Sequence, residues 1–100
     1  MNRLIEIFQR DLPAPGERKL LWHEATSIVL FNLNGSLHAI ENSCPHSGAS
    51  LFAGKLQGNV LQCPAHGFRF QLSRDGGGVP AMDLKRYPVI EEGDQVLIML

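Results

Sequence analysis

Two short stretches of the sequence place a cysteine close to a histidine, and together they use both cysteines of the chain. The first reads Cys44-Pro45-His46, the second reads Cys63-Pro64-Ala65-His66, and sixteen residues lie between His46 and Cys63. Thiolate and imidazole are the ligands that zinc and iron–sulfur centres use in proteins. The residue types and their spacing therefore make Cys44, His46, Cys63 and His66 the candidate metal ligands.

Two simpler explanations of the cysteines are weaker. A single disulfide is possible, but each cysteine has a histidine at ligand spacing, which favours metal and a reducing cytoplasm. The cysteines could also be small buried apolar residues. However, Pro45 and Pro64 follow them, and Gly48 and Gly67 come soon after, which is typical of turns rather than of a regular core element.

The composition limits the other function classes. A chain of 100 residues predicts one domain over 1–100, and a formal net charge of −1 gives no basic surface for nucleic acid. No apolar run approaches the length of a membrane span, and the first residues lack the apolar core of a signal peptide. We therefore expect a cytoplasmic protein with no membrane and no nucleic-acid partner.

The elements that must position these residues are predicted to be strands. β-Branched, aromatic and alternating apolar segments are separated by turn signals such as Asn34-Gly35 and Gly93-Asp94. The expected strands cover residues 4–8, 19–23, 27–33, 37–40, 60–62, 68–72, 89–90 and 96–100. Residues 50–56 are predicted to be a loop. No sustained helical periodicity is present, so the expected fold is all-β, a small antiparallel sandwich or barrel.

Three side chains outside the motifs have structural interpretations. Trp22 is expected to be buried or half-buried packing, and His23 to be a surface or hydrogen-bonded residue. His38 has no cysteine nearby and is expected to be structural. The glycine-rich segment 73–78 lacks the lysine and the following helix of a phosphate-binding loop.

With these residues in view, the chain resembles the Rieske family, in which two imidazoles replace two thiolates on one iron of a [2Fe–2S] cluster. More narrowly, it looks like the small ferredoxins that supply electrons to bacterial ring-hydroxylating oxygenases. The resemblance implies one cluster per chain, held by two loops in a cluster-binding subdomain at about 43–70. Cys44 and Cys63 would bind the inner iron, and His46 and His66 the outer iron.

Four positions separate this chain from the high-potential Rieske proteins of respiratory complexes. Those proteins have an additional cysteine pair, where Ala49 and Ala65 stand here, and two hydroxyl donors, where Phe68 and Phe70 stand here. The resemblance therefore implies a potential near the lower end of the Rieske range, at about −150 mV. The family's third, proline-containing loop over the cluster matches residues 78–81.

The resemblance implies an electron carrier rather than an enzyme. Its partners would be a flavin-containing ferredoxin reductase and a terminal oxygenase. A non-haem iron triad needs two histidines and a carboxylate in a large domain, and a chain of 100 residues whose only remaining histidines are His23 and His38 cannot house one beside the cluster. Two alternatives stay open: a structural Cys₂His₂ zinc module, and the Rieske-like small subunit of a larger oxidoreductase such as nitrite reductase.

Overall fold

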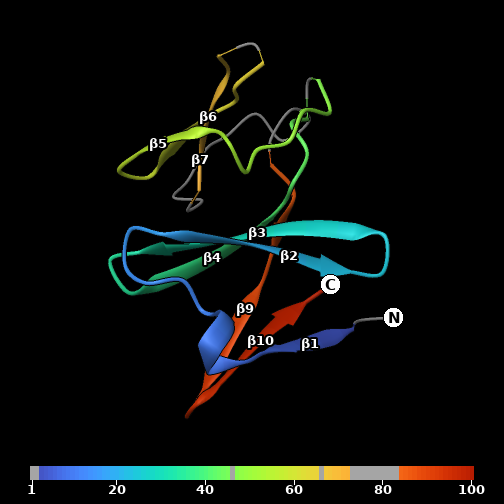
Figure 1. The fold of residues 1–100 in the computed structure, drawn as a ribbon, viewed down its shortest axis with the longest axis vertical. Coiled ribbons are helices and arrows are strands. Elements are labelled where there is room, and N and C mark those ends of the chain that lie inside the picture. The colour runs from blue at the N-terminus through green and yellow to red at the C-terminus, as the bar shows by residue number, and fades with distance from the viewer. Residues whose placement is uncertain (1–2, 46, 66, 73–83) are drawn as a thin grey trace.

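The computed structural model describes residues 3–45, 47–65, 67–72 and 84–100, and within them the fold is built from three antiparallel sheets (Figure 1). The elements in chain order are β1 (Leu4–Ile7), the short 3₁₀ helix η1 (Gln9–Asp11), β2 (Arg18–His23), β3 (Thr26–Leu33), β4 (Ser36–Glu41), β5 (Lys55–Gln57), β6 (Val60–Gln62), β7 (Arg69–Gln71), β8 (Arg86–Tyr87), β9 (Val89–Glu92) and β10 (Gln95–Met99). The prediction of an all-β fold is confirmed.

The four-stranded sheet, in the order β2-β3-β4-β8, lies in the middle of the molecule. Ile28, Val29, Leu30 and Phe31 of β3 are completely buried, because side chains alternate across a strand and both faces of this sheet are covered. Val29 and Phe31 pack on one side, in the apolar group that also contains both cysteines. Ile28 and Leu30 pack on the other side, against β10 and Tyr87.

A second sheet, in the order β1-β10-β9, covers the face of the central sheet that lies away from the cysteines. Leu4 of β1 pairs with Met99 of β10, so the first and last strands lie side by side. The chain passes from the central sheet into this sheet at Pro88, which separates β8 from β9.

The third sheet, β5-β6-β7, lies on the opposite side of the central sheet. Its first strand corrects the prediction that residues 50–56 form a loop throughout, because Lys55–Gln57 pairs with β6. Gly54 precedes this strand, and a Cβ at that position would lie only 2.7 Å from the Gln62 carbonyl oxygen. The pairing therefore requires glycine at position 54.

The hairpin turn between β3 and β4 forms where the sequence predicts it. Asn34 and Gly35 both have positive φ, at 52° and 92°, and connect β3 to β4 as the predicted two-residue hairpin.

The prediction for Trp22 was wrong, because its side chain is 68% exposed at the edge strand β2. Among the described residues, no helix is long and apolar enough to cross a membrane.

Candidate metal centre

Cys44 and Cys63 lie at the point where the β5-β6-β7 sheet meets the central sheet. They are 2% and 1% exposed, and both belong to one apolar group with Leu51, Leu61 and Leu72. Neither forms a disulfide. A pair of buried thiols in one apolar group, delivered by two separate loops, is a suitable donor set for the sulfur side of a metal centre.

The two loops share one pattern of backbone hydrogen bonds. The Cys44 N–H donates to the Ala49 carbonyl at 2.8 Å, and the Gly48 N–H donates to the Cys44 carbonyl at 2.8 Å. In the second loop, Cys63 donates to Phe68 at 2.7 Å and Gly67 donates to Cys63 at 3.0 Å. Each loop is thus a closed turn that begins at its cysteine.

Gly48 and Gly67 occupy the same place in the two turns, each with φ of 74°. That conformation strains any residue with a Cβ, which explains glycine at both positions. The N–H groups of both glycines donate to the carbonyl oxygens of the cysteines.

Part of the predicted site lies outside the described residues. His46, His66 and residues 78–81 of the predicted third loop belong to that part. The four-residue ligand set therefore stays a prediction. In the part of the chain that the structure does describe, no three His, Cys, Asp or Glu side chains are arranged to hold a metal ion.

Asn42 fixes the segment that follows the first loop. Its Oδ1 accepts hydrogen bonds from the Leu51 N–H at 2.7 Å, the Phe52 N–H at 2.9 Å and the Ser50 hydroxyl at 3.0 Å. Its Nδ2 donates to the Ser27 hydroxyl on β3 at 3.2 Å. One amide therefore connects the first loop to the central sheet.

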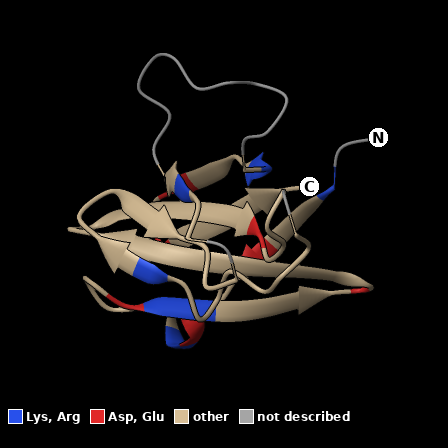
Figure 2. Cartoon of the chain, turned by 90° about the horizontal axis from the view of Figure 1, so that it is seen from above, with Lys and Arg blue, Asp and Glu red and all other residues tan. Residues whose placement is uncertain are grey.

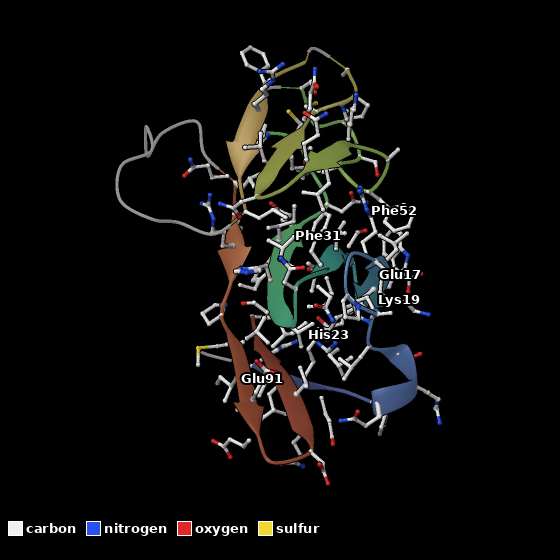
Figure 3. All side chains as sticks on the ribbon, turned by 90° about the vertical axis from the view of Figure 1, so that its left-hand side faces the viewer. Glu17, Lys19, His23, Phe31, Phe52 and Glu91 are labelled. Carbon is white, nitrogen blue, oxygen red and sulfur yellow. The ribbon has the colours of Figure 1, made fainter. Side chains whose placement is uncertain are left out.

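Two arginines, one from each edge strand of the central sheet, also reach the cysteine side. Arg18 of β2 donates to the carbonyl oxygens of Phe52, at 2.8 Å, and Gly54, at 2.7 Å. Its guanidinium lies 5.0 Å from the ring centre of Phe31, and Figure 3 labels Phe31 and Phe52 in this region. Loss of hydration on burial lowers the pKa of Arg18 from its usual value.

Arg86 of β8 makes the corresponding contacts at the other edge. It donates to the carbonyl oxygens of Leu72 at 3.1 Å, Leu84 at 3.4 Å and Gln71. These carbonyls lie on the two sides of residues 73–83, so one guanidinium joins the end of β7 to the chain that leads into β8. Arg18 and Arg86 thus hold opposite sides of the cysteine-bearing part of the fold.

Ser47 is a site residue that the sequence interpretation missed. Its hydroxyl oxygen lies 3.9 Å from the Cys63 sulfur, across the gap between the two loops. The resemblance points to hydroxyl donors only at positions 68 and 70, after the second histidine. There Phe68 is 44% exposed and Phe70 only 7% exposed, within the apolar group of the cysteines.

An all-β scaffold with two buried thiols in matched loops suits a small metal-binding domain, and comparison with known proteins identifies its family. Residues 3–88 match the model of the Rieske [2Fe-2S] domain. The chain belongs to this family, whose cofactor is a Rieske-type [2Fe–2S] cluster. The donor set described above fits that cofactor on its sulfur side.

Curated relatives are similar over most of their length. The biphenyl dioxygenase ferredoxin subunit of Pseudomonas sp. (strain KKS102) is 33% identical over 91 residues, covering 88% of this chain and 84% of the relative. The 3-phenylpropionate/cinnamic acid dioxygenase ferredoxin subunit of Photorhabdus laumondii is 34% identical over 102 residues, covering 98% and 94%.

Solved structures have the same fold. A ferredoxin of Sphingomonas yanoikuyae B1 superimposes with a TM-score of 0.78 at 26% identity, covering 98% of this chain and 99% of the other. The ferredoxin of carbazole 1,9a-dioxygenase from Nocardioides aromaticivorans IC177 gives 0.77 at 22% identity, with 95% of each chain covered.

Proposed function

We propose that this protein carries single electrons between a flavin-containing ferredoxin reductase and a terminal oxygenase, and that it makes and breaks no substrate bond itself. The observation that carries the proposal is the pair of buried thiols, Cys44 and Cys63, in two turns with the same hydrogen bonds. When bound, a Rieske cluster takes up and releases one electron.

The proposed ligands divide into two pairs. Cys44 and Cys63 bind the inner iron, and His46 and His66 bind the outer iron. The whole of 1–100 acts as one domain, with residues of about 43–70 as its cluster-binding subdomain. The apolar group around the thiols keeps water from the sulfur side, which lowers solvent access to the centre.

The names of the relatives support the choice of partners. Both relatives named above are ferredoxin subunits of dioxygenases, and the chain spans most of each. We therefore propose a terminal oxygenase as electron acceptor and a ferredoxin reductase as donor. The thiols without a disulfide suit the reducing cytoplasm, where we propose that the protein acts.

The test combines spectroscopy with electron transfer. Protein produced with iron and sulfide should be red-brown with visible charge-transfer absorption, whereas a zinc module would be colourless. Cys44→Ser, Cys63→Ser, His46→Ala and His66→Ala should each lose this absorption. With candidate reductases and oxygenases, the unmodified protein should restore electron flow from NADH to the oxygenase.

His38→Gln is the matched control, because His38 lies on β4 and its Nε2 is 3.2 Å from the Ser36 hydroxyl oxygen. This variant should keep both the colour and the electron transfer. A colourless protein with one bound zinc would overturn the proposal. So would a coloured protein that keeps its absorption when Cys63 is replaced.

A further inference from the structure

The Ser47 hydroxyl lies between two hydrogen-bonding partners. Its oxygen accepts a hydrogen bond from the Ala49 N–H at 3.3 Å, within the first loop. The same oxygen lies 3.9 Å from the Cys63 sulfur, in the second loop. This serine therefore connects the backbone of one loop to the thiol of the other.

The direction of the second contact follows from counting protons. A hydroxyl has one proton to donate and two lone pairs. The Ala49 N–H occupies a lone pair, which leaves the proton for another acceptor. A cysteine that binds metal is deprotonated and has no proton of its own. In the metal-bound protein the Ser47 hydroxyl must then be the donor and the Cys63 sulfur the acceptor.

We propose that Ser47 is a tuning residue, whose O–H donates to the Cys63 sulfur and raises the reduction potential. A donor at a ligand sulfur stabilises the additional negative charge of the reduced state more than the oxidised state. The inference rests on the proposed function, because it takes Cys63 as a cluster ligand. It replaces the expectation, drawn from Phe68 and Phe70, that no hydroxyl tunes this site.

The first measurement is the midpoint potential of Ser47→Ala. A net hydrogen bond of ordinary strength corresponds to roughly a threefold to tenfold change in an equilibrium constant. We expect the potential to fall by the shift that corresponds to this change, which for a tenfold change in the equilibrium constant of a one-electron couple is about 59 mV. Ser47→Thr keeps the hydroxyl and should stay near the unmodified value.

Ser50→Ala is the matched control. Ser50 lies in the same segment, but its hydroxyl donates to Asn42 Oδ1 at 3.0 Å rather than to a sulfur. Its removal should leave the potential unchanged. An unchanged potential in Ser47→Ala would overturn the inference, and so would an equal shift in Ser50→Ala, which would indicate a general effect on the loop.

A second measurement detects the Ser47 hydrogen bond in the unmodified protein, so it does not depend on a substitution that weakens cluster binding. In D₂O the Ser47 proton exchanges, so the reduced unmodified protein should show a deuteron coupling by pulsed EPR that Ser47→Thr retains. Absence of any such side-chain coupling would overturn the inference. If the unmodified protein has no cluster spectrum, or keeps it in Cys63→Ser, the proposed function fails. If the spectrum requires Cys63 but Ser47 has no effect, only the tuning role fails.

Discussion

Phe70 is the second residue through which the potential of this site can be tested. It is buried in the apolar group of Cys44 and Cys63. The resemblance implies that the high-potential Rieske proteins of respiratory complexes carry a hydroxyl at this position. Phe70→Tyr keeps the ring and adds one donor. We expect the midpoint potential to rise by several tens of millivolts, up to about 59 mV for a tenfold change in equilibrium constant.

Phe68→Tyr is the control for this substitution. Phe68 is exposed, so a hydroxyl on its ring meets water rather than the buried thiols, and the potential should change much less. An unchanged potential in Phe70→Tyr, with a structure that places the new hydroxyl near a ligand sulfur, would show that the missing hydroxyl does not set the potential.

At this scale the sequence predicted the type of site but not all of its contacts. Two thiols and two imidazoles at this spacing strongly indicate a metal site, because few other sets of residues offer the same ligands. The Ser47 contact has no such signal. It joins residues sixteen positions apart in different loops, and only the folded arrangement shows which side chain crosses the gap.

At the scale of elements, the arginines at the two edges of the central sheet support the loops. We expect Arg86→Gln to lower the free energy of unfolding of the cluster-loaded protein by about 1.5–3 kcal/mol, the range for hydrogen bonds to charged groups. The Gln71, Leu72 and Leu84 carbonyls would lose a charged donor. Denaturant unfolding measures the change, and faster amide exchange in residues 69–72 would locate it.

Lys19→Gln serves as the comparison. The Lys19 ammonium is exposed, at 3.9 Å from Asp11, and a surface ion pair contributes about 0–1 kcal/mol. Equal losses in Arg86→Gln and Lys19→Gln would contradict a specific role for Arg86. Arg86→Lys should recover only part of the stability, because one ammonium cannot reproduce the guanidinium's spread of donors.

The elements themselves were predictable where local chemistry decides them. The Asn34-Gly35 turn forms because both of these residues tolerate positive φ. The strand Lys55–Gln57 was missed because it is short and lacks alternation, and it exists through its pairing with β6. Trp22 was misplaced because an apolar ring in a strand pattern does not reveal that the strand is an edge with an open face.

At the scale of the whole molecule, charge is unevenly distributed. Between residues 42 and 68 the only charged residue is Lys55, and the ribbon seen from the loop side is largely uncharged there (Figure 2). Phe52 and Phe68 are exposed in this part of the chain. A partner that docks on this segment would meet few charges and two exposed aromatic rings, so short-range contact more than charge would determine binding there.

We therefore expect electron transfer to the oxygenase to depend weakly on salt. Between about 0.01 M and 1 M ionic strength the screening length falls from about 30 Å to about 3 Å. Over that range the bimolecular rate measured by stopped flow should change by less than about tenfold, whereas steered association falls steeply.

Two variants show which feature of this surface matters for the rate. Phe68→Ala should slow the reaction at all salt concentrations, and Lys55→Gln should leave it nearly unchanged. A steep decline with salt in the unmodified protein, removed in Lys55→Gln, would show that charge controls the encounter.

The pairing of the first and last strands has a practical consequence for handling the molecule. The Leu100 N–H donates to the Arg3 carbonyl at 2.7 Å, and the Arg3 N–H donates to the Leu100 carbonyl at 3.3 Å. Figure 1 places this pair of strands across the central sheet from β5-β6-β7. A peptide tag, an electrode linker or a fused reductase attached beyond Leu100 would therefore leave the cysteine-bearing loops facing outward. Immobilised in this way, the molecules would share one orientation, and voltammetry on a modified gold surface could address the centre directly.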